Sequence, residues 1–511
     1  MPGHLRALVV ILVLAIGVFT FAKAPACAVA STTGDFERRR NLWFGITLVA
    51  FLANNFWIYI FLSWALLGYA LSREANKMAM YFFLLFAVPP VPNEITGLGI
   101  INYFFSIDYV RLLALVILLP SFWSLWKQPG VERFGVLIPD KLLAGYMVLQ
   151  FVLIMTASTF TNTLRVGVFY QFIDIFLPYF VASRYLRNLQ GFKDALMGFL
   201  VAGFLLSAIG MFEYAKHWLL YAYVDNAWEV RSTFGGYLER GTSGGELRAM
   251  ATTGHAIVLG YVIAVAFGFF LYLRNFFPNQ MTRNLGLVLV LAGMFAPLSR
   301  GPWVGAAVIW LLYLATSASP GKVLFKAGLG LLMTLPILLA TSLGEKIIDL
   351  LPFTGSVQAE NVTFRARLVD VAIRVILQNP FFGAFDYIYS PQMQELKEGG
   401  IIDIVNTYIG IALSSGLVGL SLFAGFFAVI AAGIFSTMRK LPNRDDERYV
   451  LGQALLSTLI GIMVIIGTVS SVWIIPVVYW LVAGLGVAYA RMMALAKADT
   501  TTLETAKPAR F

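Results

Sequence analysis

The sequence predicts an all-α membrane protein, a polytopic transmembrane bundle of roughly 13–14 helices with two long loops on one side. Only 13% of its 511 residues are charged and 59% are hydrophobic. A soluble domain has about 25% charged residues, so this chain lacks the polar surface that water requires. Its apolar runs are continuous and mostly long enough for a bilayer core, which takes about 20 residues per helix. The strands of a membrane β-barrel would instead alternate in polarity over about 10 residues.

The composition also excludes several classes of site. A single cysteine, Cys27, excludes an intrachain disulfide and a Cys-built zinc or iron–sulfur site. Three histidines leave little for an all-histidine metal site. A net charge of +10 is typical of Lys and Arg in the cytoplasmic loops of a membrane protein, so we expect no nucleic-acid partner.

The first apolar run has two interpretations. Arg6, the run from Ala7 and the small residues Ala24–Ala30 are typical of a secretory signal with its cleavage site, but also of an uncleaved first helix. The run 78–91 is short and ends in Pro89-Pro90. The runs that we expect to cross the membrane are 7–29, 42–71, 78–91, 108–126, 139–159, 166–183, 194–213, 255–273, 284–299, 302–318, 325–343, 406–435, 449–468 and 472–490.

Lys and Arg residues predict the orientation. With these runs, the basic linkers near Arg73, Lys127, Arg184 and Arg439 and the basic tail fall on one side, expected to be the cytoplasm together with both termini. The basic run Arg38–Arg40 is an exception, because it falls on the outer side. The predicted parts are 1–30, signal-like or first helix; 31–213, N-terminal bundle; 214–254, first long periplasmic loop; 255–343, transmembrane helices; 344–405, second long periplasmic loop with an amphipathic helix; 406–492, C-terminal transmembrane helices; and 493–511, cytoplasmic tail.

The first long loop is rich in glycine, carries three arginines that include Arg248, and leads into a helix at His255. Helix N-termini expose unpaired N–H groups that favour anions, and arginine adds bidentate donors for phosphate oxygens. The loop therefore predicts an anion site at the outer surface. The alternative is a solvated loop in which acidic and basic side chains balance. His255 is either a catalytic residue or a helix cap.

The second long loop contains Arg365 and Arg367 and a helical spacing of apolar residues at Leu368, Val371, Ala372, Val375 and Ile376. This pattern predicts an amphipathic helix on the outer leaflet, ended by the proline of Asn379-Pro380. The arginines either bind substrate or meet lipid headgroups.

Two further polar residues flank predicted helices. Arg300, in Ser299-Arg300-Gly301, lies between two short apolar runs, where an arginine is costly and often faces a functional cavity. Asp403 lies just before the helix that starts at 406, either as a general base or as an N-terminal helix-capping acid.

These segments resemble the O-antigen ligase and O-antigen polymerase superfamily over roughly 230–435. The motifs that carry the resemblance are Arg248 followed by Gly254 and Gly260; Ser299-Arg300-Gly301; Arg367 through Asn379-Pro380 to Gly383; and Asn406-Thr407-Tyr408-Ile409 followed by Gly416-Leu417-Val418-Gly419. One position departs from the ligase pattern, because Val405 stands where ligases carry a histidine before the asparagine.

The resemblance implies an inner-membrane glycosyltransferase that works at the periplasmic face, on an undecaprenyl-diphosphate-linked glycan donor, without metal, nucleotide sugar or other cofactor. Arg248, Arg300, Arg365 and Arg367 would bind the diphosphate, and Asp403 or His255 would accept a proton from the acceptor hydroxyl. Arg248 and Arg367 would also stabilise the charge that develops on the leaving diphosphate.

Three functions fit this sequence. The first is a bacterial polysaccharide polymerase that joins O-antigen or exopolysaccharide repeat units, which the loss of the ligase histidine at Val405 favours. The second is a ligase that transfers glycan to lipid A core or protein. The third is a flippase or transporter for lipid-linked sugars, for which Asn54, Asn55 and Asp174 are the relevant residues. Expected partners are the lipid-linked donor, a glycan acceptor and membrane lipids, with a chain-length regulator left open.

Overall fold

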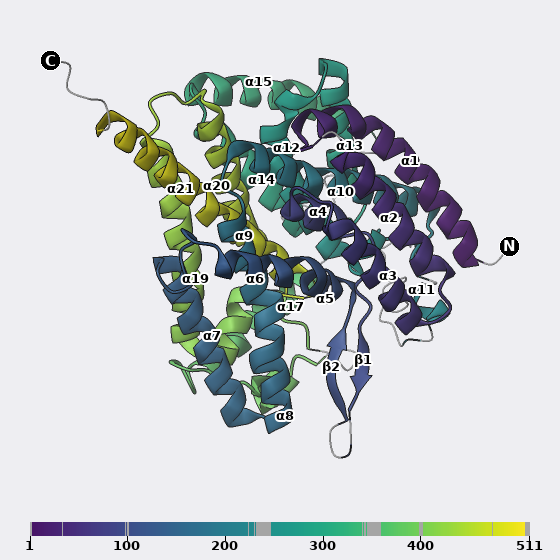
Figure 1. Ribbon diagram of the computed structural model, residues 1–511. Helices are drawn as coiled ribbons and strands as arrows, with labels where there is room; N and C mark the ends of the chain where they lie inside the picture. Colours follow the sequence, from purple (N-terminus) through teal and green to yellow (C-terminus); the bar gives the residue numbers. More distant parts are fainter. Residues whose placement is uncertain are drawn as a thin grey trace.

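The computed structural model describes residues 3–32, 34–97, 99, 102–222, 224–228, 230, 247–339, 341, 344, 359–397, 402–472 and 474–505. Within these residues the protein is a bundle of helices with one small hairpin (Figure 1). Nine of the described helices are long and apolar enough to cross a membrane, and α3 and α14 are shorter apolar helices. The all-α polytopic fold that the sequence predicts is therefore confirmed.

The first half of the chain, up to the first long loop, contains one hairpin between helices. The antiparallel strands pair Asn93 with Ile107. The bounds are α1 (Gly3–Val29), α2 (Asp35–Leu52), α3 (Phe56–Leu71), α4 (Lys77–Leu84), β1 (Asn93–Thr96), β2 (Tyr103–Ile107), α5 (Tyr109–Leu113), η1 (Ala114–Leu118), α6 (Leu119–Lys127), α7 (Ile138–Ala157), α8 (Phe160–Asn162), η2 (Thr163–Phe176), α9 (Leu177–Tyr185), α10 (Leu189–Lys216) and α11 (Val224–Ala227).

The second half is helical throughout its described residues. The bounds are η4 (Ala251–Thr253), α12 (Ala256–Leu273), η5 (Arg274–Phe276), α13 (Gln280–Phe295), α14 (Arg300–Ala315), α15 (Pro320–Leu339), α17 (Ala359–Ile376), η7 (Tyr387–Tyr389), α18 (Pro391–Gln394), α19 (Thr407–Arg439), α20 (Glu447–Ile466) and α21 (Ile475–Thr505). The sequence predicts a helix that crosses the bundle at 325–343. The structure instead has α15 lying across the top of the bundle in Figure 1, where it exposes many apolar side chains.

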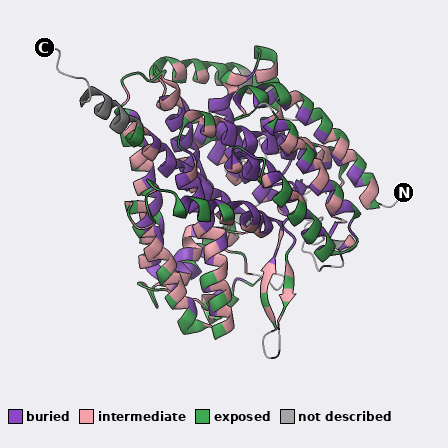
Figure 2. Cartoon of the chain, in the orientation of Figure 1, coloured by how far each residue is buried: buried purple, intermediate pink, exposed green. Residues whose placement is uncertain are grey.

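Helices α10 and α12 form the centre of the bundle, and Figure 2 shows the buried residues gathered there. Helix α10 packs against α1, α4, α12 and α13, and α12 packs also against α14 and α20. The two central helices approach closely at Gly203, where a Cβ atom would lie 2.6 Å from that of Ala266. These continuous apolar sequences are buried on all sides, as is typical of core helices in a membrane protein.

The prediction of one helix over 42–71 is wrong, because the chain forms α2 and α3 with a break at Ala53–Asn55. Asn55 caps α3 by accepting hydrogen bonds from the backbone N–H of Trp57 at 2.8 Å and Ile58 at 3.3 Å. The polar pair Asn54-Asn55 thus ends one helix and begins the next. The sequence analysis missed it because the apolar run continues on both sides.

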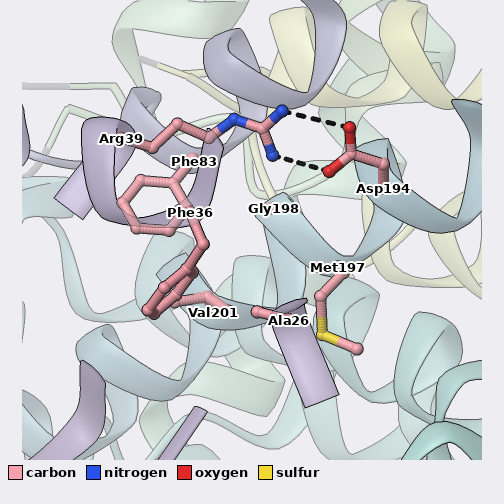
Figure 3. A pocket seen from close by; sticks show the side chains of 8 residues that line it. All are labelled: Ala26, Phe36, Arg39, Phe83, Asp194, Met197, Gly198 and Val201. Carbon is pink, nitrogen blue, oxygen red and sulfur yellow. Dashed lines mark hydrogen bonds and ion pairs between the residues drawn. The ribbon is translucent and has the colours of Figure 1, made fainter. Parts of the chain in front are cut away.

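The extra turn moves Arg38–Arg40 to the same end as the other basic linkers. The guanidinium of Arg39 pairs with Glu74 and with Asp194, each at 2.6 Å. Figure 3 shows the pair with Asp194 beside a small cavity. Ser31, which follows α1, also donates to Asp194. Arg38–Arg40 is therefore no longer an exception to the expectation that the basic linkers share one side. Helix α1 ends at Val29 beside Gln190 and Asp194, so its first residue, Gly3, lies toward the opposite end of the bundle.

Residues of the other basic linkers lie at this same end of the bundle, which we call the basic end. Lys193 pairs with Glu447 at 3.3 Å, Arg491 pairs with Glu132 at 2.7 Å, and Arg444 donates to the carbonyl of Ser317 at 3.2 Å. Helix α10 leaves the basic end and leads into the first long loop, whereas α15, which precedes the second, lies across the basic end (Figure 1). Residues 247–254, 359–397 and 402–405 lie at the other end, which we call the loop end.

The expected helix at 78–91 ends early. Helix α4 stops at Leu84, before Pro89-Pro90, and the chain then forms the β1–β2 hairpin at the loop end. Proline has no backbone N–H and restricts the residue before it, so this stretch does not continue the helix.

Candidate functional site

The short connection between α20 and α21 is the centre of the candidate site. The carbonyl of Thr468 accepts a hydrogen bond from Arg365 Nη2 at 3.3 Å, and the Ser470 hydroxyl donates to Asp403 at 2.8 Å. The Thr407 hydroxyl donates to the carbonyl of Val469 at 2.9 Å. This connection, residues 468–471, therefore joins α17, the segment before α19, and the C-terminal helices. The sequence analysis missed it because it is uncharged and lies between two apolar runs.

Arg300 reaches the same connection through the first turn of α14. The next residue, Gly301, packs so closely on Thr468 that a Cβ atom would overlap the threonine side chain. Ser299 is buried, and Arg300 is half-buried. The Ser-Arg-Gly turn thus has a packing reason: the glycine lets α14 approach residues 468–471 and places the arginine beside them.

Arg300 and Arg365 are close enough for their charges to interact. Partial removal from water is the largest effect and lowers the pKa of Arg365 below its ordinary value; the Asp403 carboxylate opposes this shift, and the positive charge of Arg300 adds to it. Two guanidinium groups therefore lie near one carboxylate. Among the residues that the structure describes here, the local charge is positive, which suits a ligand with more than one negative charge.

Arg248 is held beside the turn that leads to Arg300. Its Nε donates to the carbonyl of Pro297 at 3.1 Å, and the N–H of Ala249 donates to the carbonyl of Ala296 at 3.2 Å. The described end of the first long loop is thereby fixed to the end of α13. Three arginines from separate segments, Arg248, Arg300 and Arg365, thus gather around the α13–α14 turn and residues 468–471.

Glu213, near the end of α10, anchors this loop segment and was not expected from the sequence. Its fully buried carboxylate accepts backbone hydrogen bonds from Leu220 at 3.0 Å, Met250 at 3.0 Å and Ala251 at 2.8 Å. A buried acid that accepts several N–H donors gives the loop a defined position. No pattern in the sequence distinguishes this glutamate from a surface acid at a helix end.

Replacing Glu213 by glutamine should lower the free energy of unfolding by about 1–3 kcal/mol, because the amide cannot accept all three hydrogen bonds and leaves a buried donor unsatisfied. Thermal unfolding in detergent measures the change. The matched control is Glu94→Gln, an exposed acid of the hairpin, for which we expect a change within about 0.5 kcal/mol. Equal stabilities of the two variants would contradict the anchoring role.

Several helix N-termini point to the loop end near these arginines. A Cβ atom at Gly260, one turn into α12, would lie 2.8 Å from the side chain of Pro302, so the first turns of α12 and α14 lie side by side. Helix α19 begins at Thr407, which contacts Val469. Helix N-termini carry partial positive charge and unpaired N–H groups. They therefore add to the anion preference of the arginines.

Arg367 is placed apart from this group. Two residues along an α-helix correspond to a rotation of about 200°, so Arg365 and Arg367 leave α17 in different directions. Arg367 Nη2 donates to the carbonyl of Glu395 at 3.4 Å, on the side of α18, and its side chain is exposed. Of the two expected arginines of α17, Arg365 is the one that the structure brings to residues 468–471.

The two expected proton acceptors also differ in placement. His255 caps α12, and its Nδ1 accepts a hydrogen bond from the N–H of Ile257 at 3.1 Å. In a neutral ring with this cap, Nε2 carries the proton and acts as a donor. Asp403 is exposed and interacts with Ser470 and Arg365. The geometry therefore favours Asp403 as the acceptor of a proton.

Asn406 has a structural role in its motif. Its side chain caps α19 by accepting from the N–H of Tyr408 at 2.9 Å and of Ile409 at 3.2 Å. The neighbouring Val405 packs with the apolar core of α17, so this position contributes no polar atom to the site.

Helix α17, which the spacing of apolar residues predicts, packs one face into a small separate core. This α17 core is lined by residues from α17, the segment around α18 and α19, namely Leu368, Val371, Ala372, Val375, Met393, Leu396 and Leu413. Its other face exposes Val369 and Ile373. The small core fixes the direction from which Arg365 leaves the helix.

The α17 core is locked to α19 at two glycines. Helix α19 has a non-helical residue at Gly416, with φ +63° and ψ −167°. The backbone groups freed there bind the segment after α17: Leu417 donates to Pro380 at 2.8 Å, and Ala384 donates to Leu413 at 2.8 Å. A Cβ atom at Gly383 would lie 2.5 Å from the carbonyl of Leu413, and one at Gly416 would overlap the backbone of Phe381. We call this contact the glycine interlock.

Residues 285–424 match the family model described as O-Antigen ligase. The matched stretch contains Arg300, Arg365, Asp403 and both glycines of the interlock, whereas Arg248 lies outside it. A comparison with curated proteins found no match. The family match confirms the superfamily resemblance that the sequence motifs indicate.

Proposed function

Because residues 285–424 match the family model described as O-Antigen ligase, we propose that this chain is a bacterial polysaccharide polymerase of the inner membrane. It transfers a glycan from an undecaprenyl-diphosphate-linked donor to a hydroxyl of an acceptor glycan at the periplasmic face. The observation that carries this proposal is the gathering of Arg300 and Arg365 at residues 468–471, beside Asp403 and several helix N-termini.

The residues have distinct roles in this reaction. The acceptor oxygen forms a new bond to the anomeric carbon of the donor, and the bond from that carbon to the diphosphate oxygen breaks with its electron pair going to the diphosphate. Arg300, Arg365 and Arg248 stabilise the negative charge that grows on the leaving lipid diphosphate. The Asp403 carboxylate accepts the proton of the acceptor hydroxyl. The reaction requires neither a nucleotide sugar nor a metal ion in this proposal.

The loop end of the bundle faces the periplasm in this proposal. The basic linkers share the opposite end, as the distribution of positive charge in cytoplasmic loops requires. Including Arg38–Arg40 among these linkers removes the one conflict with that orientation.

A ligase is the second candidate, and the description of the matched family supports it. We favour polymerisation because Val405 supplies no proton acceptor where ligases carry a histidine. Two of the three residues relevant to a transporter have structural partners: Asn55 caps α3, and Asp174 pairs with Arg111 at 2.9 Å.

Reconstitution tests the proposal directly. The purified protein in detergent receives lipid-linked repeat units without nucleotide or added metal, and the products are separated by gel electrophoresis. Ladders of longer lipid-linked glycans are expected. One transfer to lipid A core would show a ligase and refute polymerisation. Absence of transfer to either acceptor, with lipid-linked sugar moving across proteoliposome membranes, would refute the transferase and support a transporter.

A further inference from the structure

An apolar groove runs along the outside of α13. It has a volume of about 310 Å³ and is lined by Phe21 of α1, Met211 of α10, and Leu285, Val288, Leu289 and Ala292 of α13. Helices α1 and α13 both pack against α10, and the groove lies between them with α10 as its floor. We call it the α13 groove.

The lining favours a hydrocarbon chain. All six lining side chains are apolar, so the groove offers no hydrogen-bonding group to a polar ligand or to water. The groove is open to the outside of the bundle, since Val288 is 60% exposed and Leu285 is 48% exposed. Both lie on α13, which runs from Gln280 to Phe295, just before the turn that carries Arg300, and the proposed function places this surface of the bundle in the bilayer. A chain can therefore enter sideways from the bilayer.

The end of the groove that is nearer the loop end adjoins the segment that carries Arg248. Met211 follows Gly210, whose Cβ position lies 3.7 Å from the side chains of both Ala249 and Ala296. Ala296 and Pro297 are the residues whose carbonyls hold Ala249 and Arg248. Ala292 lies one helical turn, about 6 Å, before Ala296.

The groove runs toward the arginines, as a ligand with an apolar tail and a charged head requires. From Leu285 to Ala292 it follows α13 for about 10 Å, parallel to the helix and toward the loop end. At that end α13 leads directly into the turn that carries Arg300. A molecule with its diphosphate at the arginines therefore has an apolar channel for its tail on the same side of the bundle.

We propose that the α13 groove binds the isoprenoid chain of the lipid-linked donor, at the units nearest the diphosphate. This proposal rests on the proposed function, since it names the site for the lipid part of the same substrate. The groove fixes the tail along α13 and so presents the diphosphate to Arg248 and Arg300. Preference for a polyprenyl lipid over a short-chain one then arises from contacts in the groove.

The test compares two substitutions on the same helix. Ala292→Phe fills the groove, whereas Leu291→Phe adds the same ring at an adjacent exposed position that does not line it. Val288→Phe is a second filling variant; Val288 is largely exposed, so its larger side chain does not disturb the core. Thermal unfolding confirms that each variant is folded.

Binding is measured without catalysis, by labelling with a sugar-free polyprenyl diphosphate that carries a photoreactive group in its first isoprene units. We expect labelling of α13 in the wild type and in Leu291→Phe, and at least about a tenfold loss of affinity in the filled variants. If added phospholipid displaced the label and unlabelled polyprenyl diphosphate did not, the proposal would be overturned. Unchanged labelling of the filled variants would overturn it as well.

Kinetics separate this proposal from the proposed function. The filled variants should raise KM for a long-chain donor by about tenfold, keep kcat, and raise KM much less for a donor with one isoprene unit, which makes few contacts in the groove. Transfer activity that the filled variants do not alter would reject the groove and retain the transferase. Labelling of the groove by polyprenyl diphosphate in a protein that transfers no glycan would retain the groove and reject the transferase.

Discussion

Replacing Arg365 by alanine is expected to lower kcat for glycan transfer by about 10²–10³-fold, the usual effect of removing one preorganised donor from a developing negative charge. Arg365 lies beside Arg300 and Asp403; partial removal from water is the main reason that its pKa is lowered, and the positive charge of Arg300 adds to this shift. Removing it leaves the diphosphate with weaker stabilisation in the transition state. The bundle should remain folded, because Arg365 is exposed and belongs to no buried core.

Arg367→Ala is the matched control for this experiment. It removes the same type of side chain two residues along the same helix, but from the side that faces Glu395. We expect its kcat to remain within about threefold of the wild type, since an exposed side chain away from the reacting groups has a small effect. The measurement is steady-state transfer with purified variants whose thermal unfolding is compared. Loss of activity in Arg367→Ala with retention in Arg365→Ala would reverse the assignment.

Arg365→Lys refines the expectation. Lysine keeps the charge but offers no planar pair of donors, so a bidentate contact with a phosphate oxygen pair is lost. We expect a kcat between those of the wild type and the alanine variant. A lysine variant as slow as the alanine variant would indicate that geometry, rather than charge, is the contribution of Arg365.

The sequence predicted those features that depend on composition and local periodicity. The apolar runs predicted the helices, and the spacing of Leu368, Val371 and Val375 predicted the amphipathic α17. The motif around Ser299-Arg300-Gly301 identified a residue that the structure places at the candidate site. These inferences succeeded because each depends on neighbours along one helix or one turn.

The sequence did not predict what depends on contacts between distant segments. Periodicity places Arg365 and Arg367 on one helix but does not say which of them faces residues 468–471. Glu213 and Ser470 carry no motif, and their partners lie far away in the sequence. The turn at Asn54-Asn55 was missed because hydropathy averages over it, and one missed turn reversed the expected side of Arg38–Arg40.

Gly416→Ala is expected to release the α17 core from α19. At Gly416 the backbone has a conformation that is nearly restricted to glycine, which costs about 1–3 kcal/mol for another residue. In addition, a Cβ atom would overlap the backbone of Phe381, which cannot move without breaking the hydrogen bonds from Leu417 and Val418. We therefore expect a loss of at least about 3 kcal/mol from the stability of this unit.

This release should affect glycan transfer more than the insertion of the protein into the membrane. Arg365 and Asp403 both belong to the segments that the glycine interlock holds, so their separation from residues 468–471 should abolish transfer. The remaining helices have their own core around α10 and α12 and should stay inserted. Limited proteolysis reports the release as faster cleavage after α17, and glycan transfer reports the loss of the site.

Gly410→Ala provides the control on the same helix. A Cβ atom there would meet only the side chain of Ile404, at 3.8 Å, and Gly410 is helical. Alanine favours a helix over glycine by about 1 kcal/mol, so this variant should be as stable as the wild type or slightly more stable. Gly383→Ala should reproduce the Gly416→Ala result from the other side of the contact, because its Cβ would press on the carbonyl of Leu413. If Gly416→Ala kept both protease resistance and activity, α17 would be held by its apolar core alone, and the interlock would have no role in placing Arg365.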